Sequence, residues 1–295
     1  MEEAKETRPK LSAVKVAVVQ ILPAYKDVKK SMVRTEVFVN ELTQKDKIDI
    51  LLQSEMVFTG YKFKDREDIR PFLEKPGLGQ TFAWCSAQAI RLNCWVLCGY
   101  PELQVNEDGT EHMYNSQMVV DPTGAFVKSY KKHFLYETDK TWAEPGPSFE
   151  TFDLKLPRED RVLKVGNGIC MDINQWEFKS EYELKEFASF HKEQGCQLIL
   201  HSSAWLDPNE HKNNKEATLS NINYWADRLS PFFDPEKIPI VKQPTYFVFS
   251  NRVGTELDTK YIGVSCILQL SPGKPRLLQN LNMIEQGIII QALLI

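Results

Sequence analysis

The chain has 295 residues, of which 42% are hydrophobic and 26% are charged, an ordinary globular composition with enough apolar material for a large core. Its net charge of −4 excludes the strongly basic character typical of a nucleic-acid-binding protein, and no basic tract indicates an anionic membrane surface. No apolar run is long enough to cross a bilayer.

Apolar strands alternate with helical patterns along the first two thirds of the chain, which predicts a largely α/β fold. Strands are expected over residues 14–22, 48–52, 94–100, 114–121, 125–130, 162–165 and 198–205, followed by 245–250, 263–270 and 287–294. Helices are expected over 31–42, 79–92, 180–194 and 219–229, with irregular segments over 137–147 and 230–244. No repeat period of 20–50 residues recurs, so we expect one folded domain.

The N-terminal segment and the cysteines indicate where this domain begins and in which compartment the protein is expected. Residues 1–12 are rich in charged side chains and lack the apolar core of a signal sequence, so we expect a disordered tail before a domain that spans 13–295. The six cysteines form no small disulfide framework, and reduced thiols favour a cytoplasmic or nuclear location. Cys94 and Cys98 have no accompanying His/Cys cluster, so no zinc site is predicted.

The predicted strand that begins at Val162 leads to two glycines, Gly166 and Gly168, and then to Cys170. Glycine gives the backbone freedom to turn and lets a substrate approach the main chain closely. The pattern therefore favours a thiol presented at the edge of a sheet. The alternative is a cysteine that only fills space, because cysteine is among the most buried residue types.

Two earlier strands also end in chemically useful side chains. Glu55 follows the second predicted strand, where α/β folds place their sites, and a solvated loop glutamate is the alternative. The fifth predicted strand runs into Lys131 and Lys132, of which one can face inward while the other is solvated. His133 is either a base or ligand, or a hydrogen-bonded structural residue.

Because strand ends in one sheet can meet, Glu55, Lys132 and Cys170 form a candidate site. An ammonium favours the thiolate of a neighbouring cysteine, and a carboxylate can accept the thiol proton and later hand it to a leaving amine. The lysine, together with the backbone N–H of Met171, can stabilise the oxyanion that forms when sulfur attacks a carbonyl. This set suits hydrolysis of an amide through a thioester that water resolves.

The segments that carry these residues resemble the nitrilase, or carbon–nitrogen hydrolase, superfamily, whose catalytic trio is Glu, Lys and Cys in that order. The matching segments are SEMVFTGY around Glu55, YKKHFL around Lys132, GICMDI around Cys170, LHSSAW ending at Trp205, and FSNRVGTE around Asn251. The resemblance implies a four-layer α-β-β-α sandwich, no metal, no organic cofactor, and Lys132 rather than Lys131 as the catalytic lysine. It also makes His133 a structural residue. One departure is Ser54, where relatives often have proline before the glutamate.

Within the superfamily, the chain is similar to the fungal-type N-terminal asparagine/glutamine amidases of the N-degron pathway. The segments that carry this similarity are CGYPEL, MYNSQMVV, YKKHFLYETDKTW, GICMDINQWEF and NYWADRLSPF. The similarity implies hydrolysis of the side-chain carboxamide of an N-terminal Asn or Gln, giving Asp or Glu and ammonia. Peptide or protein N-termini are then the substrates, and other enzymes of the N-degron pathway are candidate partners. A small-molecule ω-amidase or carbamoylase and an inactive binding module are the alternatives, and the chain is compatible with a monomer or a homodimer.

The resemblance also suggests residues that support the trio. Relatives often have a second acidic residue beside the lysine, and Asp139 fits best by its distance from Pro145-Gly146, with Glu137 as the rival. Ser203 and Trp205 lie at the end of the next strand and are expected to line the substrate pocket.

The α-ammonium of an N-terminal residue requires acidic or carbonyl lining. Asp27, Asp172 and Glu177 are candidates by position alone. Asp172 is also explained as a structural residue, because it follows the nucleophile in relatives with other substrates.

Overall fold

The computed structural model describes residues 12–209, 213–234 and 244–295, so the predicted tail lies outside the described residues except for Ser12. Two six-stranded sheets form the centre of the described chain. The first has the order β14-β1-β2-β3-β4-β5 and comprises β14 (Gly287–Leu294), β1 (Ala13–Gln20), β2 (Ile50–Leu52), β3 (Trp95–Val105), β4 (Glu111–Val120) and β5 (Phe126–Lys131). The second has the order β13-β12-β9-β8-β7-β6 and comprises β13 (Lys274–Asn280), β12 (Cys266–Ser271), β9 (Thr245–Asn251), β8 (Leu198–Ser203), β7 (Val162–Ile169) and β6 (Thr151–Lys155).

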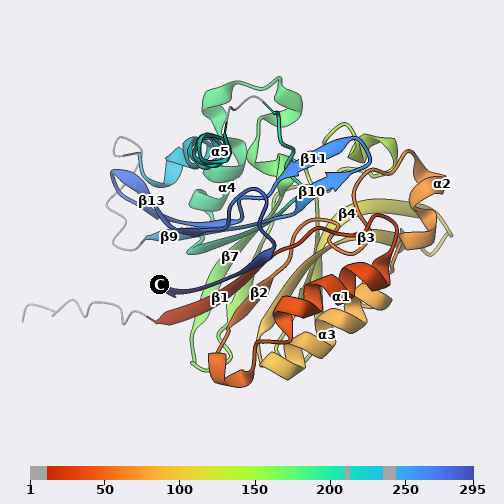
Figure 1. Ribbon diagram of the computed structural model, residues 1–295, viewed down its shortest axis with the longest axis horizontal. Coiled ribbons are helices and arrows are strands. Elements are labelled where there is room, and N and C mark those ends of the chain that lie inside the picture. Colours follow the sequence, from red (N-terminus) through yellow and green to blue (C-terminus); the bar gives the residue numbers. More distant parts are fainter. Residues whose placement is uncertain (1–11, 210–212, 235–243) are drawn as a thin grey trace, which may run out of the picture.

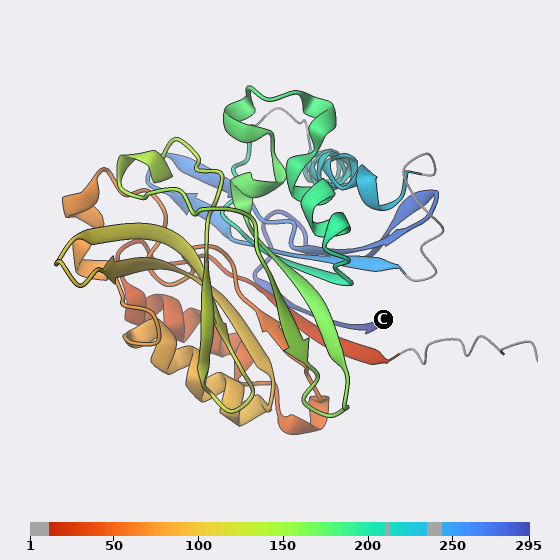
Figure 2. The ribbon, with the colours of Figure 1, turned by 180° about the vertical axis from the view of Figure 1, so that it is seen from behind.

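The two sheets share one internal arrangement, with parallel strands at the centre and antiparallel strands at the edges. In the first sheet β1, β2 and β3 are parallel, and in the second β7, β8 and β9 are parallel. The last strand, β14, pairs antiparallel with β1, so the C-terminus lies beside the beginning of the first strand (Figures 1 and 2). Parallel central strands direct their carboxyl ends to the same edge, which is where α/β folds place functional side chains.

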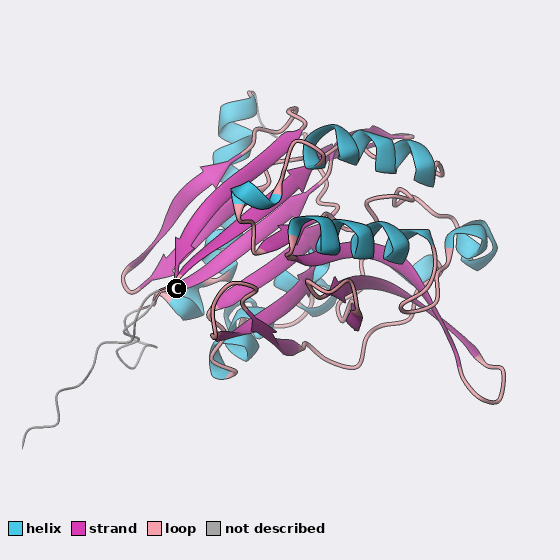
Figure 3. Cartoon of the chain, turned by 90° about the horizontal axis from the view of Figure 1, so that it is seen from below, coloured by secondary structure: helices cyan, strands magenta, loops and turns pink. Residues whose placement is uncertain are grey.

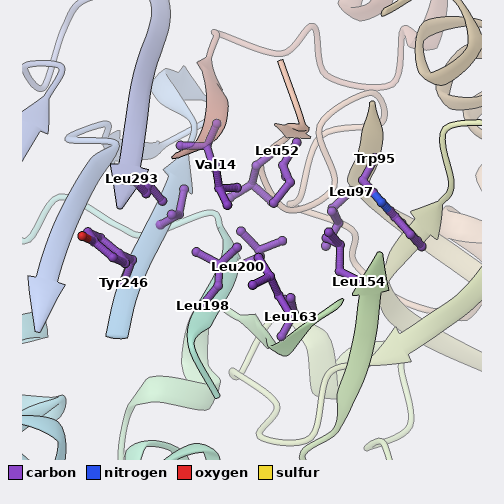
Figure 4. Close-up of a cluster of buried hydrophobic side chains, with 14 of the residues drawn as sticks. Val14, Leu52, Trp95, Leu97, Leu154, Leu163, Leu198, Leu200, Tyr246 and Leu293 are labelled. Atoms are coloured by element: carbon purple, nitrogen blue, oxygen red, sulfur yellow. The ribbon is translucent and has the colours of Figure 1, made fainter. Parts of the chain in front are cut away.

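The sheets pack face to face, and their facing surfaces form an apolar core (Figure 4). The first sheet contributes Val14, Leu52 and Leu97, and the second contributes Leu163, Leu198 and Leu200, all buried. Alternation of side chains along a strand explains why each sheet has a second apolar face to cover.

Helices cover both outer faces. Helices α1 (Val28–Val39) and α3 (Gln80–Leu92) pack side by side on the outer face of the first sheet (Figures 1 and 3). Helices α4 (Glu186–Glu193) and α5 (Asn214–Arg228) pack on the second sheet. The result is the four-layer α-β-β-α sandwich expected from the resemblance. None of the helices in the described residues is long and apolar enough to cross a membrane.

Shorter elements connect these layers. They are the helix α2 (Arg66–Ile69), the hairpin β10 (Val253–Glu256) and β11 (Thr259–Ile262), and the 3₁₀ turns η1 (Gln44–Asp46), η2 (Arg70–Phe72), η3 (Asp139–Thr141), η4 (Cys170–Ile173), η5 (Trp176–Phe178), η6 (Tyr182–Leu184) and η7 (Ser230–Phe232).

The sequence predictions missed β6, β13 and the β10–β11 hairpin, and they misplaced several ends. The helix expected over 180–194 is divided, because Lys185 adopts a left-handed φ of 45° between η6 and α4. The helix expected over 219–229 begins earlier, at Asn214, where the Asn213 side chain accepts a hydrogen bond from the Glu216 backbone N–H. This N-cap satisfies a backbone donor that the first helical turn leaves without an internal partner.

Candidate active site

Glu55 follows β2 and Lys132 follows β5, and although β3 and β4 lie between these strands in the first sheet, the two side chains are in direct contact. The Lys132 ammonium donates to Glu55 Oε1 at 2.7 Å and to Asp139 Oδ2 at 2.6 Å, and all three side chains are fully buried. Glu137 is therefore not the acidic neighbour of this lysine. An ammonium has three donors, so one N–H of Lys132 is left after these two contacts within the described residues.

Asn115, from β4, links the two carboxylates. Its side-chain amide donates to Glu55 Oε1 at 2.7 Å and to Asp139 Oδ1 at 2.9 Å. Asp139 also accepts from the Tyr61 hydroxyl at 3.1 Å. The other oxygen of Glu55, Oε2, accepts from the backbone N–H of Ala204 at 2.7 Å. Oε1 is thus held by an ammonium and an amide, whereas Oε2 has one protein donor and keeps a lone pair for a reacting proton.

Cys170 lies at the end of β7 in the second sheet, and its own backbone makes the turn there. Its φ is 43°, in the left-handed region that non-glycine residues rarely adopt. Such strained conformations concentrate at functional sites. The turn begins η4, and the charges of Glu55 and Lys132 both act on the pKa of the thiol.

The two glycines before Cys170 have a different role from the one predicted. Both lie inside β7, and neither has a positive φ. A Cβ on Gly166 would lie 2.6 Å from His191 Nδ1, and one on Gly168 would lie 2.5 Å from His201 Cδ2. They therefore admit the side chains that pack on the outer face of the second sheet, rather than a substrate or a turn.

A third glycine, Gly99, makes room for the segment that carries Glu55. A Cβ on Gly99 would lie 2.5 Å from the Glu55 Cα and 2.7 Å from the carbonyl oxygen of Ser54. The Gly99 N–H donates to that same carbonyl at 3.2 Å. This close backbone approach holds the turn at Ser54 and Glu55.

The electrostatic balance of the cluster differs from the sequence-based expectation. Burial raises the pKa of the Cys170 thiol, the charge of Glu55 raises it further, and Lys132 lowers it by less. Burial alone would lower the pKa of Lys132, but the charges of Asp139 and Glu55 outweigh it and raise that pKa. Burial and the charge of Glu55 thus favour the protonated thiol over the thiolate. This direction favours a mechanism in which a base takes the thiol proton over one in which the ammonium maintains a thiolate.

Glu55 is suited to be that base. Burial raises its pKa, the Asp139 charge raises it too, and Lys132 and Asn115 lower it. A carboxylate with a raised pKa is a stronger proton acceptor than an exposed one.

Cys170 opens onto a cavity of about 680 Å³ beside α5. Met171 and Trp205 line this cavity, as expected for substrate-binding residues. Ser203 is fully buried behind them, and its hydroxyl is among the groups that lower the pKa of the Cys170 thiol. The polar side chains that line the cavity are Tyr61, Tyr136, Asn174, Asp207, Ser220, Asn221 and Tyr224.

The three candidates for ammonium binding do not line this cavity. Asp27 is an exposed N-cap residue of α1, where it accepts from the Lys30 backbone N–H at 3.0 Å. Glu177 forms ion pairs with Lys140 and Lys179, which lower its pKa to about 2. Asp27 is thus engaged in a helix cap and Glu177 in ion pairs, although the neighbouring Phe178 does line the cavity.

Asp172 is buried and structural. It accepts from the Tyr130 hydroxyl and from the backbone N–H groups of Phe134 and Ile169, each at 2.8 Å. It therefore ties the turn at Cys170 to the segment that follows Lys132.

The neighbours of Lys132 lie outside the cluster. Lys131 places its ammonium 4.1 Å from the centre of the Tyr114 ring. His133 packs against Phe134 and Phe149, and its Nδ1 lies 2.7 Å from the Gly146 carbonyl oxygen, which indicates a structural role.

Sequence reasoning missed Asn115, Tyr61 and Asp207. Asn115 begins a run of three polar residues, Asn115, Ser116 and Gln117, before the apolar end of β4, which is a weak signal. Asp207 lies just beyond the strand that ends at Ser203, and that position at a strand end was an available signal.

Comparison with known proteins places this geometry in context. Residues 15–214 match the family described as carbon-nitrogen hydrolase. A protein N-terminal amidase of Schizosaccharomyces pombe is 32% identical over 292 residues, covering 94% of this chain and 98% of that protein. A protein N-terminal amidase of Saccharomyces cerevisiae is 34% identical over 220 residues, covering 69% of this chain and 47% of that protein.

The fold has a close counterpart among solved structures. The crystal structure of an N-terminal amidase with an Asn-Glu peptide superposes with a TM-score of 0.83 at 24% sequence identity, covering 96% of this chain and 98% of that one. At 24% identity, this similarity shows a shared fold and nothing further.

Proposed function

This chain belongs to the carbon–nitrogen hydrolase family, and on that premise we propose that it hydrolyses the side-chain carboxamide of an N-terminal asparagine or glutamine. The products are an N-terminal Asp or Glu and ammonia. The observation that carries the proposal is the buried Lys132 ammonium between Glu55 and Asp139, next to a thiol at the base of a cavity large enough for the end of a peptide. In a protein fated for degradation, this reaction prepares a residue that the N-degron pathway acts on next.

The proposed reaction begins with proton transfer from the Cys170 thiol to Oε2 of Glu55. The sulfur attacks the carboxamide carbon, and a carbon–sulfur bond forms while the carbonyl oxygen becomes an oxyanion. The remaining N–H of Lys132 and the backbone N–H of Met171 stabilise that oxyanion. Protonated Glu55 then donates its proton to the departing nitrogen, so ammonia leaves and a thioester remains.

Water completes the cycle. Glu55, now a carboxylate again, takes a proton from water as the water oxygen attacks the thioester carbon. The carbon–sulfur bond breaks, Cys170 recovers its proton from Glu55, and the carboxylic acid product leaves. Asp139 and Asn115 do not exchange protons in this sequence. They hold Lys132 and Glu55 in position.

An ω-amidase or carbamoylase would use the same chemistry on a small substrate that carries a carboxylate. Such a substrate calls for a basic residue in the pocket. Among the described residues that line the cavity there is no lysine or arginine, whereas there is one aspartate, and this composition favours a cationic substrate group.

The test is ammonia release from matched substrates. We expect turnover of Asn- and Gln-starting peptides with a free α-amino group, and little turnover of glutamine-like free acids or N-carbamoyl amino acids. Faster turnover of the small acids would replace the proposal with the ω-amidase or carbamoylase alternative. An inactive module would release no ammonia from any of them, and iodoacetamide would then label Cys170 no faster than Cys94 or Cys266.

A further inference from the structure

Among the described residues that line the cavity beside Cys170, Asp207 is the one acidic residue. The segment that follows β8 provides it, and the same segment provides Ala204 and Trp205 to the site. The Asp207 side chain is only 4% exposed. A carboxylate so well buried is costly unless a cation or donors face it.

The protein supplies part of that compensation from the β10–β11 hairpin. Lys260 Nζ lies 2.6 Å from Asp207 Oδ2, and the Asn209 backbone N–H donates to Oδ1 at 2.9 Å. The Asp207 backbone N–H also donates to the Lys260 carbonyl oxygen at 2.8 Å, which fixes the aspartate on the hairpin. A carboxylate has about four acceptor positions, so these two side-chain contacts leave capacity for a further donor.

We propose that Asp207 binds the α-ammonium group of the substrate and thereby selects a chain terminus over an internal residue. The inference rests on the proposed function, because Asp207 would bind the free α-amino group of the substrate at that same site. Asp207 lies three residues beyond Ala204, whose N–H contacts Glu55. Three residues span at most about 10 Å, which bounds the separation of Asp207 and Ala204 along the chain. Asp207 and Cys170 also line the same cavity.

The remaining wall is consistent with a cationic group. Aromatic rings of Trp205, Tyr224 and Phe178 line the cavity, and the faces of such rings attract ammonium groups. An acetylated N-terminus has no charge for either the carboxylate or the rings to attract. The substrate class selected by this site is therefore a peptide with an unblocked N-terminal asparagine or glutamine.

The experiment measures ammonia release from an Asn-starting peptide and from its N-acetylated form, as kcat and KM separately. We expect wild type to prefer the free amine strongly. In Asp207→Asn we expect the KM for the free-amine peptide to rise about 10- to 100-fold, the range for losing a hydrogen bond to a charged partner, with little change in kcat. The acetylated peptide should be processed by this variant as it is by wild type.

Lys260→Met is the matched control, because it breaks the same ion pair but keeps the carboxylate. We expect its KM for the free-amine peptide to be no higher than that of wild type, since no lysine then competes for Asp207. The double variant Asp207→Asn/Lys260→Met removes both charges and guards against misfolding caused by an unpaired lysine, and it should repeat the KM effect of Asp207→Asn.

The outcomes separate the two proposals. If Asp207→Asn and the double variant keep the wild-type preference for the free amine, the Asp207 assignment is wrong while the proposed function stands. The same conclusion follows if Lys260→Met raises KM as much as Asp207→Asn, because the ion pair is then only structural. If wild type releases no ammonia from either peptide, the proposed function and this inference are both overturned.

Discussion

Replacing Asn115 with alanine tests whether the amide that joins the two buried carboxylates is required for catalysis. In the wild-type chain both hydrogens of this amide are used, one on Glu55 Oε1 and one on Asp139 Oδ1. The variant leaves each carboxylate one donor short in a site from which water is excluded. It leaves the Lys132 contacts in place, so the change concerns position and proton affinity rather than net charge.

The size of the effect follows from these two bonds. A hydrogen bond to a charged group contributes about 1.5–3 kcal/mol, so losing both should lower the free energy of unfolding by about 3 kcal/mol or more. The bond to Glu55 acts on the group that exchanges protons, and its loss should reduce kcat/KM about 10- to 100-fold. Asn115 also lowers the pKa of Glu55, so the variant should lose activity at a higher pH than wild type as the pH falls.

The assay is the pH dependence of kcat/KM for an Asn-starting peptide, beside urea unfolding of the same proteins. Ser116→Ala is the control, because Ser116 is the next buried residue on β4 and its side chain points to the opposite face of the sheet. Ser116→Ala should keep the wild-type pH profile. A fall in activity for Asn115→Ala with an unmoved acid limb would refute the positioning argument and indicate general damage to the fold.

Three further predictions concern other parts of the molecule. Cys170→Ala should release no ammonia yet still bind an Asn-starting peptide by calorimetry, and measurable turnover would remove the thiol from the mechanism. Lys132→Met should abolish turnover and lower the free energy of unfolding by about 3–5 kcal/mol, because it leaves two buried carboxylates without their cation. Lys131→Met is the control and should lower it little. Equal losses of the two variants in urea unfolding would contradict this prediction. Burial lowers the pKa of His191 to about 3, so the unfolded chain binds a proton at this residue at a higher pH than the folded protein does. The free energy of unfolding should therefore fall by on the order of 5 kcal/mol as the pH falls from 6.5 toward 3. His191→Leu should therefore make unfolding free energy less dependent on pH in that window, and an unchanged slope would show that the ring is already charged in the folded protein.

The charge balance of the cluster gives the mechanism its order of events. Two carboxylates surround one ammonium, and the raised pKa of Cys170 favours the thiol over the thiolate, so in the proposed mechanism Glu55 takes the proton as sulfur attacks. The same neutralisation keeps Lys132 charged in a fully buried position. In the proposed mechanism, Lys132 therefore needs no additional proton before it stabilises the oxyanion that forms when sulfur attacks the carboxamide.

Much of the framework was predictable because its signals are local. Runs of apolar residues such as 48–52 and 162–165 indicate buried strands without any knowledge of their neighbours, and glutamate, lysine and cysteine directly after such strands mark the edge of a sheet. The ordered motifs around Glu55, Lys132 and Cys170 were also sufficient to identify the family. Edge strands such as β13 were missed, because its exposed and half-buried residues give no continuous apolar run.

The three-dimensional fold decided what depends on contacts between distant segments. Asn115 reaches Glu55 across 60 residues, and Asp139 rather than Glu137 meets Lys132 because the turn after β5 directs it inward. The resting protonation of Cys170 depends on the sum of these charges and on burial, neither of which is written in any single motif. Likewise Asp207 joins the cavity wall, and Asp27 does not, only because the sheets and the hairpin pack as they do. Residue type and pattern thus determined the chemistry available to this protein, whereas tertiary packing determined which side chains share a low-dielectric site and how strongly they act on one another.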